Sequence, residues 1–90
     1  MNKFKDKKKI LLEAVAKVVY ESRKKKNIGI QLLSYEYDLP SMSLQKIEKG
    51  LRDPQLSTIW KIANALDMDF EDFIKKVKKN LPSGFNLFEN

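Results

Sequence analysis

The chain has 90 residues, a mass of 10.5 kDa and a formal net charge of +6, with 42% apolar and 33% charged residues. This length suits one domain, and a folded chain of this mass buries roughly 64% of its unfolded surface. The chain contains no cysteine and no histidine. Disulfide scaffolds, thiol nucleophiles, Cys/His zinc sites and His-based acid–base catalysis are therefore excluded. No constellation of residues supports an enzyme, so we expect a binding protein without a cofactor or metal.

The charge is distributed unevenly. Residues 1–26 carry ten Lys and Arg against three acidic residues (+7), residues 27–74 carry four against eight (−4), and residues 75–90 carry four against one (+3). Basic ends suit a polyanion such as nucleic acid or an anionic membrane surface. Charge alone supports equally well the alternative that these lysines are solvated and only maintain solubility.

The N-terminal lysines followed by Ile10-Leu11-Leu12 faintly resemble a secretory signal, but Glu13 and Lys17 interrupt the apolar run. No stretch approaches the ~18–20 apolar residues of a membrane span. We therefore expect a soluble cytoplasmic protein without a membrane partner.

The first predicted element is a helix over residues 6–26. Its apolar residues recur at positions 11, 15, 18 and 12, 15, 19, which is the spacing of an amphipathic helix. Asn27-Ile28-Gly29 ends the helix after a basic last turn, where the helix dipole favours positive charge.

Two short helices are predicted next, over residues 30–37 and 42–49. Asp38-Leu39-Pro40 closes the first of them, Ser41 is the expected N-cap of the second, and Gly50 ends it. Two short helices joined by a turn of three or four residues describe a helix-turn-helix unit.

The fourth predicted helix is opened by Pro54 and Ser57. The fifth is capped by Asp69, has Asp72 three residues later, and ends at residues 81–84. No segment indicates a strand, so we predict an all-α domain of five helices. The faces expected to be buried are Leu56, Ile59, Ile62, Ala63 and Leu66 in the fourth helix and Phe70, Phe73, Ile74 and Val77 in the fifth.

Several residues recur together at fixed spacing between Val19 and Phe73. They are Arg23, Leu33 and Ser34, Leu39, the set Leu44, Ile47, Glu48 and Gly50 ("I-x-x-I-E-x-G"), Arg52-Asp53-Pro54 ("R-x-P"), and Leu56, Thr58, Ile62, Ala63, Ala65 and Leu66 ("L-x-T-L-x-x-I-A-x-A-L"). In these residues the sequence resembles the Cro/C1-type (Xre-like) helix-turn-helix family of phage and bacterial repressors.

The resemblance implies a lambda-repressor-like DNA-binding domain over residues 19–74, with the helix-turn-helix as its second and third helices. Residues 1–18 are then a basic N-terminal extension with the start of the first helix. Residues 75–90 are the basic end of the fifth helix and an apolar tail.

The resemblance also implies a transcriptional regulator that binds double-stranded DNA by placing its third helix in the major groove. Lys46 can donate to guanine, Ser41 to several base edges, and Met42 can pack on a thymine methyl group. The expected base-contacting residues are Ser41, Met42, Gln45 and Lys46. The expected phosphate-contacting residues are Gln31, Lys49, Arg52, Ser57, Thr58 and Lys61.

The resemblance assigns Arg23 and Glu48 to a structural ion pair between the first and third helices. Arginine suits this role because its planar guanidinium can meet a carboxylate with two hydrogen bonds. Ser34 is expected to be small because the two helices of the motif cross closely there.

Some residues depart from the family pattern. Gly29-Ile30 stands where the family has Ser-Gln and the Gln braces a phosphate, Asp38 replaces a turn glycine, and Pro40 replaces a Ser or Thr cap. With the acidic middle segment, these departures motivate an alternative: a protein-interaction module, of antitoxin or adaptor type, that has lost base reading. The two functions differ in whether DNA binding survives replacement of Lys46 and Lys49.

One short helix reads only a few base pairs, so we expect a homodimer with half-sites about 34 Å apart. A further protein partner remains an open possibility, as does an N-terminal arm of lysines 3, 5 and 7–9 on DNA phosphates.

The acidic residues 69, 71 and 72 are interpreted as favourable charges at a helix N-terminus, not as a metal site. For Tyr35, Tyr37 and Trp60, core packing or a partner surface is favoured over base stacking. The expected dimer residues are Phe73, Val77, Phe85, Leu87 and Phe88.

Overall fold

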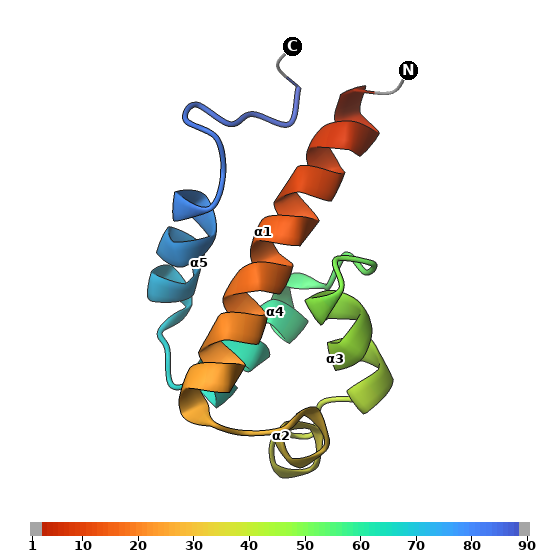
Figure 1. The fold of residues 1–90 in the computed structure, drawn as a ribbon, viewed down its shortest axis with the longest axis vertical. Helices are drawn as coiled ribbons and strands as arrows, with labels where there is room; N and C mark the ends of the chain where they lie inside the picture. Colours follow the sequence, from red (N-terminus) through yellow and green to blue (C-terminus); the bar gives the residue numbers. More distant parts are fainter. Residues whose placement is uncertain (1–2, 89–90) are drawn as a thin grey trace.

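The computed structural model describes residues 3–88, and this part of the chain contains helices and no strand (Figure 1). The helices are α1 (Lys3–Lys26), α2 (Ile30–Tyr37), α3 (Ser41–Glu48), α4 (Leu56–Ala65) and α5 (Phe70–Lys79). The all-α, lambda-repressor-like fold is therefore confirmed.

The long helix α1 is the axis of the molecule. At about 1.5 Å per residue its 24 residues account for most of the 41 Å length of the molecule. Figure 1 shows α5 on one side of α1 and α3 on the other. The helix begins three residues before the predicted start and runs through residue 18 without a break. Among the described helices, none is long and apolar enough to cross a membrane.

Three helix ends use a non-glycine residue in the left-handed backbone region. Asn27, Asp38 and Asp67 follow α1, α2 and α4 with φ of 59°, 53° and 63°. Asn and Asp tolerate this region better than most residues, because their short polar side chains can form local hydrogen bonds. Asp38 thus takes the backbone conformation that the family's turn glycine provides.

The helix starts differ in part from the prediction. Pro40, at φ −60° and ψ 126°, is the N-cap of α3, so Ser41 is its first helical residue and caps nothing. Likewise α4 begins at Leu56 after Gln55, which makes no side-chain capping bond. Asp69 does precede α5, but its carboxylate makes no capping bond and acts there as a charge near the helix N-terminus.

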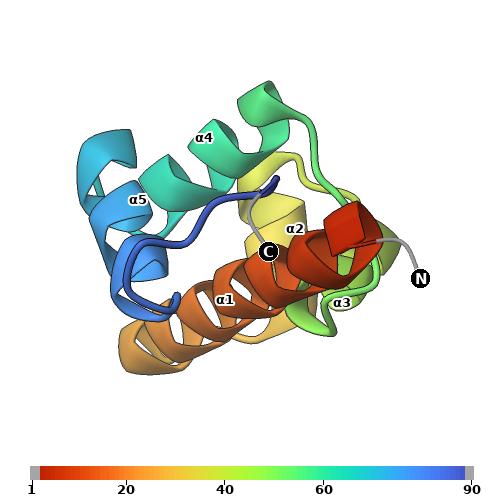
Figure 2. The same cartoon turned by 90° about the horizontal axis from the view of Figure 1, so that it is seen from above.

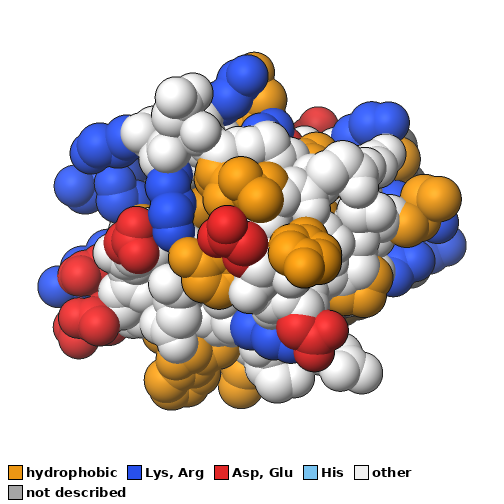
Figure 3. Space-filling model, turned by 90° about the horizontal axis from the view of Figure 1, so that it is seen from below, with side chains coloured by type: hydrophobic (Ala, Val, Ile, Leu, Met, Phe, Trp, Pro, Cys, Tyr) orange, Lys and Arg blue, Asp and Glu red, His pale blue; other side chains and the backbone are white. Residues whose placement is uncertain are grey.

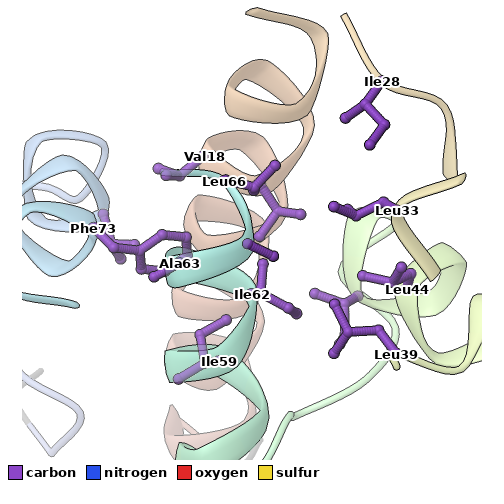
Figure 4. Packing of buried hydrophobic residues seen from close by; sticks show 14 of the residues in the cluster. Val18, Ile28, Leu33, Leu39, Leu44, Ile59, Ile62, Ala63, Leu66 and Phe73 are labelled. Atoms are coloured by element: carbon purple, nitrogen blue, oxygen red, sulfur yellow. The ribbon is translucent and has the colours of Figure 1, made fainter. Parts of the chain in front are cut away.

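The core joins the helix-turn-helix to the rest of the domain through α4 (Figure 4). Ile62 and Leu66 lie between Leu33, Leu39 and Leu44 on one side and Phe73 on the other, and all six side chains are buried. Burial of such side chains stabilises the fold by roughly 1.5–3 kcal/mol each. Side chains of α4 thus contribute to the core on the side of α2 and α3 as well as on the side of α5.

The segment after α5 turns back along the N-terminal half of α1 (Figures 1 and 2). The rings of Phe4 and Phe88 stack with centroids 5.9 Å apart, and Lys7 Nζ lies 6.0 Å from the ring centroid of Phe85. Phe85 and Leu87 are half-buried. The predicted apolar tail thus covers the extended start of α1 of its own chain.

Candidate nucleic-acid interface

Helix α3 has one face in the core and the other in solvent. Leu44 and Ile47 are each 1% exposed, whereas Met42 is 62% exposed. Lys46 lies one turn after Met42 and is exposed as well, as is Lys49 at the C-cap. Ser41 and Gln45 are partly exposed. The residues predicted to contact bases therefore lie together on the solvent side of α3, and Met42 has no part in the core.

A bidentate ion pair joins α3 to α1. Arg23 donates from Nε to Glu48 Oε2 at 2.6 Å and from Nη2 to Glu48 Oε1 at 2.9 Å. Its Nη1 donates to the carbonyl oxygen of Ile28 at 2.9 Å. The hydrogen bonds that Arg23 donates to Glu48 raise the pKa of Arg23 above its ordinary value. Both side chains are over 90% buried, which matches the predicted structural role and leaves them no access to DNA.

The turn between α2 and α3 is fixed by Ser34. Its hydroxyl donates to the carbonyl oxygen of Leu39, whose N–H donates to the carbonyl oxygen of Ser34 at 3.1 Å. The prediction for Ser34 rested on small size alone, whereas the structure gives its hydroxyl a specific partner. A serine, as opposed to an alanine, is the signal that points to this bond.

Several predicted phosphate ligands meet where α3 and α4 approach each other. Arg52 Nη1 donates to Ser43 Oγ at 2.9 Å, and Arg52, Ser43 and Thr58 line an open hollow of about 430 Å³. Ser57 lies beside Thr58 in the first turn of α4 and is exposed. The structure thus places the hydroxyl of Thr58 and the guanidinium of Arg52 next to α3.

The other predicted phosphate ligands lie apart from this hollow. Lys61 Nζ donates to the carbonyl oxygen of Asp38 at 2.8 Å and lies 3.7 Å from its Oδ2, so Lys61 braces the turn between α2 and α3. Gln31 is exposed in the first turn of α2. No basic residue lies on α2, so its exposed surface adds no positive charge to the interface.

Ion pairs neutralise much of the negative charge of the middle segment. Lys8 Nζ lies 3.2 Å from Asp53 Oδ2, which places the start of α1 beside the loop that carries Arg52. Because Glu48 is held by Arg23, Lys46 and Lys49 are left as the exposed charges of α3. The acidic residues of this segment in ion pairs are Asp38, Glu48, Asp53, Asp67 and Glu71.

Lys26 has a structural role that the sequence does not reveal. Its Nζ donates to Tyr37 Oη at 3.0 Å and to the carbonyl oxygen of Ala65 at 2.7 Å, and lies 3.4 Å from Asp67 Oδ2. The hydrogen bond with Tyr37 raises the pKa of Lys26, and Asp67 adds to the effect. One lysine of the last turn of α1 thus connects α2 and the end of α4. In the sequence, a basic last turn indicates only that positive charge is favoured there by the helix dipole.

The exposed aromatic residues lie outside the recognition face. Tyr35 is 86% exposed on α2, and Leu32 of the same helix is half exposed. Seen from below, the molecule presents hydrophobic side chains near the centre of the face around α2 (Figure 3). Trp60 of α4 is 49% exposed and stacks on Phe70 with ring centroids 4.5 Å apart.

The structure gives Phe73 and Val77 a different place from the predicted dimer surface. They are 0% and 3% exposed, because the apolar stripe of α5 is used against α1 and α4 within one chain. Phe85 and Leu87 lie against the start of α1 and are half-buried, which leaves Phe88 as the exposed member of the predicted set.

Two short helices, α2 and α3, joined by a three-residue turn, with α3 packed in the core by one face and exposed at the other, are typical of the helix-turn-helix class. Residues 19–73 match the Cro/C1-type helix-turn-helix family, and the chain belongs to this family of DNA-binding regulators. Searches of curated proteins and of solved structures give no significant match.

Proposed function

We propose that this chain is a sequence-specific transcriptional regulator that places α3 in the major groove of double-stranded DNA and has no enzymatic activity. The observation that carries the proposal is the division of α3 into two faces. Leu44 and Ile47 are buried, while Met42, Lys46 and Lys49 project into solvent. A rigidly held helix with exposed side chains is what base reading requires.

In this proposal the side chains of the interface differ in role. Lys46, Met42 and Ser41 contact base edges, because they lie in the first turns of α3. Lys49 and Arg52, with the hydroxyls at the start of α4, contact phosphates and set the position of the protein on the duplex. Gly29-Ile30 removes one phosphate ligand that the family places at the start of α2, and the ion pair of Asp53 with Lys8 removes one negative charge near the duplex.

Selection of duplexes from a random library, followed by titration from about 50 to 200 mM salt, tests this function. We expect a preferred sequence whose binding exceeds that of random DNA by at least about 10³-fold. Lys46→Ala should relax the preference at one base position. Lys49→Ala should weaken all sequences alike and lower the salt slope by about one. Lys78→Ala, an exposed change on α5, is the control. Sequence-blind binding that disappears with salt would contradict the proposal.

A homodimer accompanies this proposal, because one α3 covers only part of an operator and two half-sites lie about 34 Å apart. Leu56 and Trp60 of α4 are exposed and lie beside the half-buried Phe70 of α5; these three residues are here called the α4–α5 apolar surface, and their exposure supports a second copy as partner. Apolar surface exposed in this way is typical of sites of association.

A protein-interaction module is the second candidate function. The exposure of Leu32, Tyr35 and Met42, together with Ile30 at the start of α2, favours it. The double variant Lys46→Ala/Lys49→Ala distinguishes the two functions. In the first, the native chain binds a preferred duplex and the variant loses that binding. In the second, the native chain shows only weak binding without sequence preference, and the variant still binds its protein partner.

A further inference from the structure

A groove between α1 and α5 lies outside the proposed DNA interface. Two hollows, of about 560 and 310 Å³, share Ser22, Lys25, Lys76 and Lys79 in their walls, and together they are here called the α1–α5 groove. Figure 1 places α5 on the side of α1 away from α3. A duplex held by α3 therefore leaves this groove open to another ligand.

The α1–α5 groove is lined by five lysines and three acidic residues. Lys26 is held by Asp67, and Lys75 lies 3.5 Å from Glu71. The side-chain amines of the remaining lysines, Lys25, Lys76 and Lys79, have no hydrogen-bond, ion-pair or ring partner within residues 3–88. In Figure 3 lysines gather on the side where α5 lies, with acidic side chains beside them. The groove thus offers three uncommitted positive charges from two helices.

Apolar side chains lie among these charges. Leu66 and Val18 are buried at the base of the groove, and Met68 is half-buried. The lining described contains no aromatic ring on which a base would stack, and Glu21, Asp67 and Asp72 would repel a continuous row of phosphates. A ligand with separate carboxylates and apolar groups fits this mixture better than a nucleic acid does.

We propose that the α1–α5 groove binds an acidic amphipathic segment of a partner protein. Its carboxylates pair with Lys25, Lys76 and Lys79, and its apolar side chains pack over Leu66 and Met68. An amphipathic helix in a groove between two helices is a recurring mode of peptide recognition. The site is independent of α3, so the partner and DNA can be bound at the same time.

The probe for this site is a fluorescein-labelled peptide of glutamate and leucine at helical spacing, titrated into the full chain by fluorescence anisotropy. A poly-glutamate peptide of equal length and a single-stranded oligonucleotide are titrated in parallel. The groove variant is Lys25→Glu/Lys76→Glu/Lys79→Glu. The matched control, which makes the same charge change at exposed positions of the same two helices, is Lys17→Glu/Lys24→Glu/Lys78→Glu.

We expect the amphipathic peptide to bind the native protein most tightly of the three probes. The groove variant should weaken this binding at least about tenfold, and the control by less than about threefold. Circular dichroism confirms that both variants fold. Equal weakening in both variants, an equal affinity for poly-glutamate or the oligonucleotide, or no binding of the amphipathic peptide would each overturn the proposal.

Discussion

At the scale of single residues, Arg23 and Glu48 are the charged pair on which the geometry of α3 depends. Three of the hydrogen-bonding groups of Arg23 are used, two on Glu48 and one on the backbone of Ile28. Loss of either charge would leave the other buried without a partner, which is far more unfavourable than loss of an exposed pair.

We therefore predict that Glu48→Gln lowers the free energy of unfolding by about 3–5 kcal/mol. The same change at Glu71, whose side chain is 79% exposed in its pair with Lys75, should alter it by less than about 1 kcal/mol. Urea denaturation followed by circular dichroism measures both values. A loss below about 1 kcal/mol for Glu48→Gln would show that Arg23 is satisfied without its carboxylate partner.

The second prediction at this scale concerns Lys26 at alkaline pH. Tyr37 and Asp67 raise its pKa in the folded protein, so folding favours the charged amine. The resulting stabilisation is complete below the unfolded pKa of about 10.4 and is lost as the pH rises through the higher folded pKa.

Denaturation of the native chain and of Lys26→Met from pH 7 to 11 tests this. The difference in their free energies of unfolding should be constant at neutral pH and shrink above about pH 10. A difference that stays constant to pH 11 would contradict the role of the Lys26 charge.

At the scale of the elements, the helix ends depend on residues that tolerate a left-handed backbone. The side chain of Asn27 is exposed after α1, and its N–H donates to the carbonyl oxygen of Lys24 at 2.9 Å. Its φ of 59° is unfavourable for a residue with a Cβ and favourable for glycine.

We predict that Asn27→Ala lowers the free energy of unfolding by about 1 kcal/mol, whereas Asn27→Gly keeps or raises it. Position 17, exposed in the middle of α1, provides the control, because there alanine should be more stable than glycine by about 1 kcal/mol. The order of the two substitutions thus reverses between the positions. The same order at both would mean that the backbone of Asn27 is not strained.

A helix can be predicted well when the residues that start and end it lie next to it in the sequence. The limits of α2 agree with the prediction, because Gly29 and Asp38 are turn residues next to it in sequence. The start of α3 differs from the prediction by one residue, because Pro40 is the N-cap. Its fixed φ suits this position, and it makes no side-chain capping bond. Turn and capping residues in the sequence therefore predict the helices well and the first residue of each helix less well.

The residues of the candidate site also fall into two groups, those that the sequence predicts and those that it does not. The outward residues of α3 and the Arg23–Glu48 pair follow from the family resemblance, which fixes their spacing. The pairs Lys8–Asp53 and Lys26–Asp67 join residues over 40 positions apart and carry no motif. They depend on how α1 crosses the other helices, so charge counts along the chain exaggerate the acidity of the middle segment.

At the scale of the whole molecule, the question is which apolar surface is left for a second copy. The tail after α5 uses Phe85 and Leu87 against α1, and Phe88 stacks on Phe4. The α4–α5 apolar surface keeps Trp60 half exposed and Leu56 more so. Leu32 and Tyr35 of α2 are exposed as well, but α2 belongs to the helix-turn-helix. Outside that unit, α4 exposes a leucine and a tryptophan one turn apart, and we expect the dimer to form there.

This predicts opposite results for two kinds of variant in analytical ultracentrifugation. A chain ending at Pro82 should remain a dimer, whereas Trp60→Glu should be monomeric, because a charge at the centre of an apolar contact is desolvated without a partner. Leu56→Glu removes no intramolecular ring contact and should also be monomeric, which separates loss of the dimer from loss of the Trp60–Phe70 stack. A monomeric truncated chain beside dimeric Trp60 and Leu56 variants would place the dimer surface on the tail. Since two half-sites bind one dimer far more tightly than two monomers, the monomeric Trp60→Glu chain should also lose affinity for a two-half-site duplex by at least about 10²-fold.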